Sequence, residues 1–252
     1  MLKTPVLSPQ QIDDFETQGY LVARGAFGAA DMATIDAWTK ELLAMPEEPG
    51  RHWVYHEKSL KDPAKKLVSR IENITPFHAG FAELAQALKA PVAQLLGEDA
   101  ALFKEKVNFK MPGGDGFKAH QDSQAGWDAY TDFYISVLVC IDEATPENGC
   151  LEIAGGQHKR GLFKSWEPLT EQDMAGMEFV SCPTKPGDLV FFDCYAPHRS
   201  APNMSDRIRR LYYATYNRLS DGDFLERYYA DKHKNYPPDI EREAGKTYVF
   251  RV

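Results

Sequence analysis

The stretch FYISVLVCI, residues 133–141, decides the fold class because it is an almost unbroken run of apolar residues. It is too short to cross a bilayer, so we expect a strand that is buried on both faces. Further β-rich segments surround it: ALFKEKVNFKM (101–111), CLEIA (150–154), GDLVFFD (187–193) and IRRLYYATYN (208–217). Turns rich in Gly, Pro and Asn separate these segments. Short strands without intervening helices predict an antiparallel core of the jelly-roll, cupin-like kind over residues 101–220.

The N-terminal third carries helical patterns instead. In SPQQIDDFETQG, Ser8 is a candidate N-cap, Pro9 takes the first helical position and Gly19 ends the helix. The segment GAADMATIDAWTKELLAMP (28–46) has apolar residues at helical spacing. Residues 80–96 predict one or two further helices, broken at Pro91.

The domain organisation follows from these strand-like and helix-like sequence patterns. Residues 51–77 are rich in aromatic and charged residues and show no clear pattern, whereas residues 221–252 predict one helix and an extended tail. The chain contains no repeat, low-complexity tract or obvious linker. We therefore expect a single domain over residues 1–252, mainly β, in which residues 1–100 give mostly helical support.

Composition and charge exclude several function classes. The chain is 43% hydrophobic and 26% charged, which suits a globular protein, and its net charge of −8 argues against nucleic acid or an anionic membrane as partner. The start MLKTPVLSPQQIDDF lacks the apolar segment of a secretory signal. Four cysteines without a C-x-x-C pair favour free thiols in a reducing cytoplasm. We expect a cytoplasmic protein that binds a small molecule; the sequence holds no signal for its oligomeric state.

A His-x-Asp motif lies in GFKAHQDS, residues 116–123, after a glycine-rich turn. Alternate residues of a strand point the same way, so His120 and Asp122 are expected to share a face. A third ligand is available in FFDCYAPHRSAPN, where His198 follows a strong strand. Two His and one carboxylate leave three positions of an iron open, as in non-haem Fe(II) oxygenases. The open positions suit a chelating 2-oxo acid and O2.

A 2-oxo acid such as 2-oxoglutarate also needs a cation at its far carboxylate. A guanidinium serves best, because its planar fork matches a carboxylate and stays charged. In RIRRLYYATYN (207–217), Arg209 shares a strand face with Arg207 and Leu211, and Arg210 takes the opposite face. A positive charge inside the barrel is unfavourable unless an anion pairs with it.

Taken together, these motifs resemble the phytanoyl-CoA dioxygenase family, whose members are Fe(II)- and 2-oxoglutarate-dependent oxygenases on a double-stranded β-helix. The resemblance spans roughly residues 10 to 250 and rests on HQD (120–122), HRSAPNMSDRIRR (198–210), GDLVFFD, GCLEIAGGQHKRG (149–161) and RYYADKHKNYPPDIER (227–242). It implies that Arg209, eleven residues after His198, binds the C5 carboxylate of 2-oxoglutarate and that Ser200 assists.

The strand before the His-x-Asp motif supplies further candidates. EKVNFKMPG (105–113) resembles the corresponding strand of ectoine hydroxylases, in which polar residues reach 2-oxoglutarate and substrate. By that analogy one or two of Lys104, Lys106 and Asn108 enter the site. We assign Lys104 and Asn108 to 2-oxoglutarate and Lys106 to the substrate.

Residues next to the ligands are candidates for the substrate pocket. Gln121 lies between two ligands, and a loop carrying Trp127 and Tyr130 would roof the iron. The alternative for both aromatic residues is packing in the core. His158 is a rival metal ligand, but no carboxylate follows two residues later, so a loop or substrate-side position suits it better.

The resemblance to bacterial members of the family favours hydroxylation of an aliphatic carbon in a small polar metabolite, such as 2-aminoethylphosphonate or an N-methylated analogue, next to phosphorus. Lys104, Lys106 and Asn108, with Arg70 or His56, would hold the anion. Trp127, Tyr130 and Asp128 would attract the ammonium group, since aromatic faces bind cations. No separate acid or base residue is expected, because the chemistry is centred on iron.

Alternative functions remain open at this point. Within the same class, the substrate could be ectoine, an amino acid or an acyl-CoA. From other classes come a zinc-dependent hydrolase, which would leave Arg209 without an anion to neutralise, and a non-catalytic cupin-like metal-binding protein, which the complete set of ligands disfavours.

Overall fold

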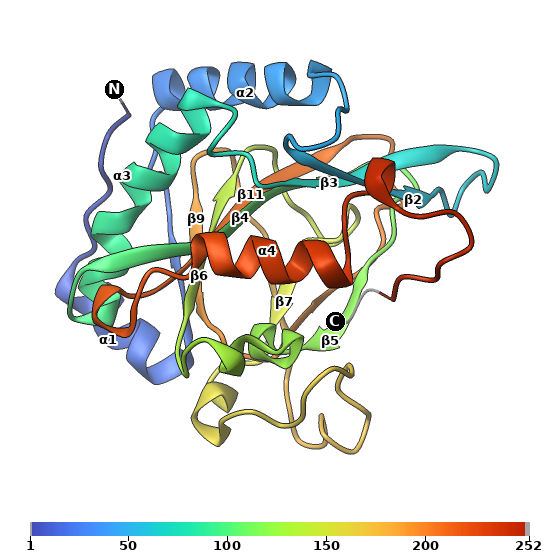
Figure 1. The fold of residues 1–252 in the computed structure, drawn as a ribbon. Coiled ribbons are helices and arrows are strands. Elements are labelled where there is room, and N and C mark those ends of the chain that lie inside the picture. Colours follow the sequence, from blue (N-terminus) through green and yellow to red (C-terminus); the bar gives the residue numbers. More distant parts are fainter. Residues whose placement is uncertain (1, 250–252) are drawn as a thin grey trace.

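The structure is a computed structural model that describes residues 2–249. Its centre is a seven-stranded sheet in the order β1-β9-β6-β11-β4-β3-β2, in which all neighbours are antiparallel. Its strands are β1 (Tyr20–Ala23), β2 (Trp53–Lys58), β3 (Lys66–Glu72), β4 (Ala100–Lys110), β6 (Ile135–Cys140), β9 (Leu189–Asp193) and β11 (Arg209–Arg218). This sheet forms one wall of the barrel (Figure 1).

A smaller sheet forms the facing wall. It has the order β5-β10-β7-β8, with strands β5 (Phe117–His120), β7 (Leu151–Ile153), β8 (Val180–Cys182) and β10 (His198–Ser200). The two antiparallel sheets form a double-stranded β-helix, as the sequence predicts. Every residue of β6 is buried, which confirms the strand expected from the opening apolar run.

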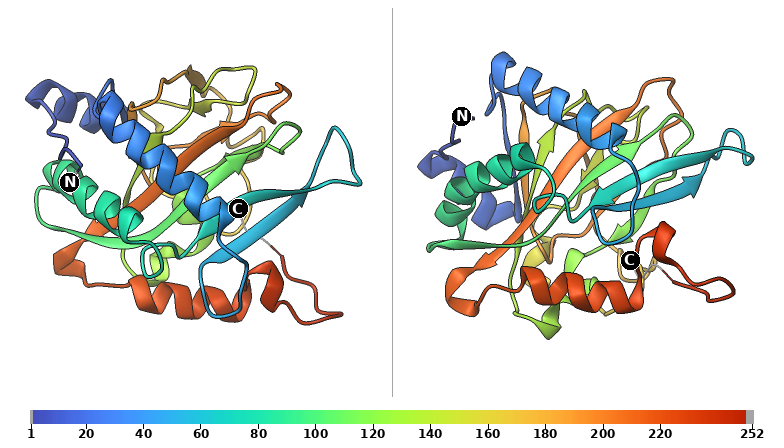
Figure 2. Two further views of the ribbon diagram at one scale, coloured as in Figure 1. Left: turned by 90° about the horizontal axis from the view of Figure 1, so that it is seen from above. Right: turned by 45° about the horizontal axis from the view of Figure 1, so that its top comes forward.

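Helices cover the outer face of the large sheet. These are α1 (Pro9–Gln18), α2 (Ala29–Ala44) and α3 (Ala79–Leu96), and Figure 2 shows α2 and α3 lying across that face. One hydrophobic cluster joins them to the sheet, with Leu84 and Leu88 of α3 packed in the same core as Val107 and Tyr212. This shared core supports our proposal that the chain folds as one domain.

The termini of α1 lie where the sequence places them. Ser8 accepts a hydrogen bond from the backbone N–H of Gln11, Pro9 opens the helix, and Gly19 ends it at φ 74°. A left-handed φ of this kind favours glycine. The C-terminal part forms α4 (Leu225–Asn235), which packs against β4, and continues as a tail. No helix among residues 2–249 is long and apolar enough to span a membrane.

Two local expectations differ from the structure. Residues 51–77, which lack a sequence pattern, contain the hairpin of β2 and β3, so the N-terminal third supplies three strands of the large sheet as well as helices. The helix α3 continues through Pro91 as one unit. Pro91 is buried, so the packing of the apolar face of α3 on the sheet outweighs the backbone hydrogen bond that proline removes.

Candidate active site

Three potential metal ligands meet at one end of the barrel. His120 ends β5 and His198 begins β10, and the two residues are paired across the small sheet. Asp122 opens the short 3-10 turn that follows β5. One ligand atom of each residue lies within 4.8 Å of the others, and no other such group of His, Cys, Asp or Glu occurs among residues 2–249.

Backbone hydrogen bonds orient both imidazoles. Nδ1 of His120 lies 2.7 Å from the carbonyl oxygen of Lys118, and Nδ1 of His198 lies 3.0 Å from that of Ala196. When each Nδ1 donates its proton there, each Nε2 presents a lone pair. Burial lowers the pKa of both imidazoles, with the neighbouring His198 as a further cause for His120, whose pKa falls to about 3. Both rings are therefore neutral, which is the form that binds metal.

The carboxylate is positioned by two hydroxyl groups on neighbouring strands. Ser136 Oγ of β6 donates to Asp122 Oδ2 at 2.7 Å, and Thr215 Oγ1 of β11 lies 2.9 Å from Ser136 Oγ. Burial alone would raise the pKa of Asp122, but His198 and Lys104 outweigh it and hold the pKa below its ordinary value. Two neutral imidazoles and one ionised carboxylate, open to a cavity on one side, fit a facially bound Fe(II).

A pair of buried cations lies farther along the large sheet. Arg209 is 2% exposed, and its Nε has no hydrogen-bond partner in the described chain. Lys110 is its partner across β4 and β11, and it donates to Ser200 Oγ at 2.8 Å and to the Ala201 carbonyl oxygen at 2.6 Å. Burial and the nearby Arg209 lower the pKa of Lys110 to about 7. An unpartnered buried guanidinium nitrogen fits the far carboxylate of 2-oxoglutarate.

The cations at this end connect to the cavity through Tyr213. Its hydroxyl lies near Arg209 and Asn108, both of which act to lower its pKa against the effect of burial. Tyr213 and Asn108 line the cavity, whereas Arg209, Lys110 and Ser200 lie behind its wall. Arg207, which shares a strand face with Arg209 in the sequence pattern, precedes β11 and is exposed.

The cavity has a volume of about 730 Å³ and contains the ligand triad in its wall. Lys104, Lys106 and Asn108 all line it, more than the one or two expected, because alternate residues of β4 face the lumen. Further lining residues come from β3, α4 and the tail: Glu72, Tyr228, Asp231, Lys232, Lys234, Tyr236, Lys246 and Tyr248.

Trp127 and Tyr130 line the cavity and also belong to its packed wall. The Trp127 ring contacts Phe103, and Lys104 Nζ lies 4.5 Å from its centroid. Tyr130 donates to Asp231 Oδ2 at 3.1 Å. The ring of Trp127 that was expected to attract a substrate ammonium therefore faces a lysine of the protein itself.

A second tryptophan closes the cavity from the loop that follows β7. Trp166 lines the wall with a left-handed backbone at φ 70°, which is uncommon for a bulky residue. Its N–H donates to the carbonyl oxygen of Gln124 at 2.7 Å. Its indole lies against Gly126, where any Cβ atom would overlap the ring.

Several expected contacts are corrected by the structure. Gln121 points away from the cavity, because a residue between two that face the lumen faces outward, and its amide binds the carbonyl oxygens of Gly161 and Tyr195. Asp128 is exposed outside the cavity. Neither Arg70 nor His56 reaches the wall, since each pairs with an acidic residue of its surroundings.

His158 is not part of the metal cluster and lies 3.3 Å from the carbonyl oxygen of Glu16. Sequence reasoning missed other contributors. Lys110 continues the alternation of Lys104, Lys106 and Asn108, and Ser136 is a polar residue within an apolar run, so both carried a signal. Glu72 and Lys232 had no local sequence pattern that would place them in the cavity wall.

The fold and the site together define a class: a double-stranded β-helix with a His-Asp-His triad and a buried cation suits Fe(II) oxygenases that consume a 2-oxo acid. Comparison with known sequences confirms and narrows this class. The model of the phytanoyl-CoA dioxygenase family matches residues 15–211. The chain belongs to the phytanoyl-CoA dioxygenase family.

Characterised relatives cover nearly the whole chain. The 2-aminoethylphosphonate dioxygenase of uncultured bacterium HF130_AEPn_1 is 37% identical over 95% of this chain and 92% of its own length. The methylphosphonate hydroxylase of Gimesia maris is 36% identical, over 91% and 88%. Among solved structures, EctD from S. alaskensis with 2-oxoglutarate and 5-hydroxyectoine has a TM-score of 0.73 at 24% identity, covering 88% of this chain and 84% of that chain.

These findings settle the class of enzyme. The protein is an Fe(II)- and 2-oxoglutarate-dependent dioxygenase. The predicted family, fold, enzyme class and cofactors are thereby confirmed, and neither the zinc hydrolase nor the non-catalytic binding protein is needed.

Proposed function

We propose that this enzyme hydroxylates a small phosphonate, such as 2-aminoethylphosphonate, at the carbon bonded to phosphorus. The observation that carries the proposal is a group of lysines, Lys104, Lys106 and Lys232, in the wall of the cavity that also holds the ligand triad. A neutral amino acid would leave most of these charges without a partner. The names of the two relatives that act on phosphonates agree with this chemistry.

In this proposal His120, Asp122 and His198 bind the iron. Iron and 2-oxoglutarate, when bound, supply the oxidising power that inserts one oxygen atom of O2 into a C–H bond, with release of succinate and CO2. The protein's part is to keep both imidazoles neutral and Asp122 ionised through the hydrogen bonds at Nδ1 and Oδ2. The aromatic wall around Trp127 limits the access of water to the reacting carbon.

Arg209 is proposed to hold the far carboxylate of 2-oxoglutarate, with Ser200 and Lys110 beside it. Asn108 lies near the Arg209 end of the cavity, next to Tyr213. Lys104 lies farther away. It is six residues from Lys110 on one strand, about 20 Å, whereas a five-carbon diacid spans about 6 Å. We therefore reassign Lys104 from 2-oxoglutarate to the substrate side.

A succinate-release screen tests the proposed function. Purified enzyme with Fe(II), 2-oxoglutarate and O2 is given 2-aminoethylphosphonate, its N-methylated analogues, methylphosphonate, ectoine, amino acids and an acyl-CoA. We expect succinate only with phosphonates, and a 31P NMR signal for a hydroxylated product. Release with ectoine or an amino acid, and with no phosphonate, would refute the proposal.

A further inference from the structure

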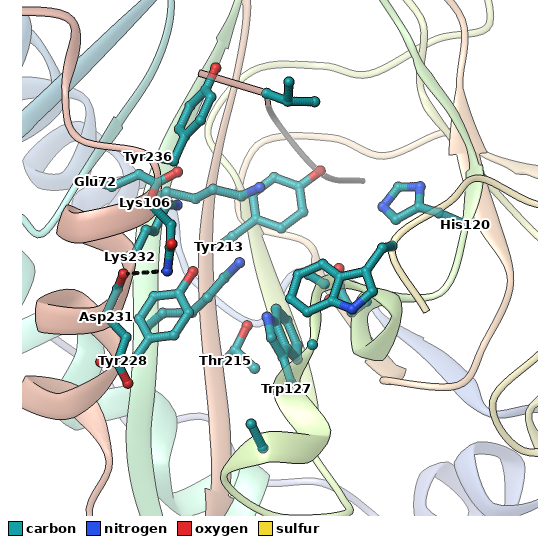
Figure 3. A pocket seen from close by; sticks show the side chains of 18 of the residues that line it. Glu72, Lys106, His120, Trp127, Tyr213, Thr215, Tyr228, Asp231, Lys232 and Tyr236 are labelled. Carbon is teal, nitrogen blue, oxygen red and sulfur yellow. Dashed lines mark hydrogen bonds and ion pairs between the residues drawn. The ribbon is translucent and has the colours of Figure 1, made fainter. Parts of the chain in front are cut away.

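The cavity wall across from the metal ligands gathers three lysines around one carboxylate. Lys104 and Lys106 come from β4, Lys232 from α4 and Glu72 from β3, and Glu72 is paired with Lys106 across the sheet. Figure 3 shows Glu72, Lys106 and Lys232 on the side of the cavity across from His120. Segments far apart in the sequence thus converge on one corner of the cavity.

Glu72, the carboxylate that binds Lys232 in this corner, is already committed. Glu72 is 2% exposed, accepts from Arg70 Nε at 2.7 Å and also binds Lys232 Nζ. Burial would raise its pKa, but Lys232 and Arg70 outweigh this and hold the pKa far below its ordinary value. Glu72 therefore balances one positive charge and cannot neutralise the remaining lysines.

The ammonium groups of Lys104 and Lys106 have no hydrogen bond or ion pair with any residue in the described range 2–249. Their nearest partners are rings: Trp127 at 4.5 Å from Lys104 Nζ and Tyr213 at 5.0 Å from Lys106 Nζ. A lysine charge held away from water without a counter-charge is unfavourable. Among residues 2–249 neither ammonium group has an ion-pair partner, and an anionic ligand can supply one.

The side-chain types indicate which anion fits. A guanidinium matches a planar carboxylate, and no arginine lines the described cavity. Lysine ammonium groups act as point charges and suit a tetrahedral oxyanion. Two lysines without an ion pair match the two negative charges of a phosphonate, and Lys232, which is paired with Glu72, lines the same wall.

We infer that Lys104, Lys106 and Lys232 form a binding site for a phosphonate dianion, in which Glu72 is a positioning residue that fixes Lys232. The inference rests on the proposed function and names the part of the substrate that the protein holds. Trp127 then positions Lys104 and does not enclose the substrate ammonium.

Calorimetry without oxygen tests the site separately from turnover. Enzyme loaded with Fe(II) and 2-oxoglutarate is titrated with methylphosphonate and with methanesulfonate, which has nearly the same shape and one charge less. We expect methylphosphonate to bind at least about tenfold more tightly, because the second charge pairs with a second lysine. Equal affinities would overturn the inference.

Substitutions locate the site. Lys104→Met and Lys106→Met should each weaken methylphosphonate binding at least about tenfold, while the affinity for 2-oxoglutarate, which reports an intact fold, stays within about twofold. Lys58→Met, on an exposed end of β2, is the matched control and should change neither.

The outcomes distinguish the two proposals. If phosphonates are turned over while both variants bind methylphosphonate like the wild type, the inferred site is wrong and the proposed function stands. If methylphosphonate binds at these lysines but no phosphonate is hydroxylated, the site stands and the proposed function is wrong.

Discussion

The lumen face of β4 has two ends that carry the same kind of charge in different settings. At one end Lys110 is held by Ser200 Oγ and the Ala201 carbonyl oxygen, next to Arg209. At the other end Lys104 and Lys106 have only aromatic rings beside them in the described chain. The first end is already hydrogen-bonded without a ligand, whereas in the inferred site an anionic ligand completes the second.

This difference separates the proposed site of 2-oxoglutarate, which all enzymes of this class consume, from the proposed site of the substrate, which differs between them. Lys110, which we propose to lie beside the far carboxylate of 2-oxoglutarate, donates hydrogen bonds to a hydroxyl and to a backbone carbonyl oxygen, so its geometry tolerates little change. Lysines held by ring faces can change partners without loss of a hydrogen bond. Substrate specificity can therefore change at one end of a strand while cosubstrate binding persists at the other.

The largest effect is expected where the two ends meet, at the iron. Asp122→Ala removes the only anionic ligand, so we expect turnover to fall at least about 1000-fold, or about 4 kcal/mol. The visible band that Fe(II) and 2-oxoglutarate give without oxygen should disappear in this variant. Ser136→Ala, which removes only a hydrogen bond to Asp122, should keep the band with about tenfold weaker iron binding. An unchanged band in Asp122→Ala would contradict the assignment.

A substitution at the end of the cavity next to Arg209 and Lys110 should weaken the binding of 2-oxoglutarate alone. Arg209→Met leaves a carboxylate buried without its cation, which costs about 3 kcal/mol, or about 100-fold in the Kd for 2-oxoglutarate. Methylphosphonate binding to the iron-loaded variant should change less than about threefold. Titration of each ligand by calorimetry measures both. Equal losses for the two ligands would show that the ends are not independent.

The smallest effect on binding is expected from the opposite face of the same strand. Glu105 is 1% exposed and accepts from the N–H groups of Ile74 and Thr75 at 2.5 and 3.0 Å. Burial raises its pKa from 4.5 to about 7. The folded state therefore favours the protonated carboxyl, and this contribution, roughly 3 kcal/mol, is complete below about pH 4.5 and is lost as the pH rises through about 7.

Glu105→Gln keeps the acceptor oxygen and removes the titration. We expect urea unfolding at pH 5, 6.5 and 8 to show a weaker loss of stability with pH in the variant than in the wild type. Both ligand affinities should stay unchanged. The same pH slope in both proteins would argue against a protonated Glu105.

Local signals made the metal site predictable from sequence. His120 and Asp122 are two residues apart in the chain, His198 follows a strong strand, and Arg209 was assigned from the resemblance to the family. The two ends of α1 follow from the capping residue Ser8 and from Gly19. These features depend on neighbours in sequence and on the two-residue period of a strand.

The substrate end depends on contacts that no local pattern reveals. Glu72 is buried in β3, where Lys232, far along the chain, and Arg70 bind it, and its charge interrupts the hydrophobic pattern of that strand. The side chain of Gln121 was wrongly expected in the substrate pocket, because its position between two ligands in the sequence does not show which way the side chain points. Pro91 was treated as a break because the packing of α3 on the sheet cannot be read from the helix alone.

The contact of Gly126 with Trp166 makes two distant positions interdependent. A side chain at position 126 would occupy the space of the indole, and a smaller residue at position 166 would open the cavity wall. We expect relatives that enclose their substrate in the same way to keep glycine and tryptophan as a pair. Relatives with a residue larger than glycine at position 126 should not have tryptophan at position 166. The pair of residues at positions 126 and 166 can therefore indicate which relatives enclose their cavity in the same way, independent of overall sequence identity.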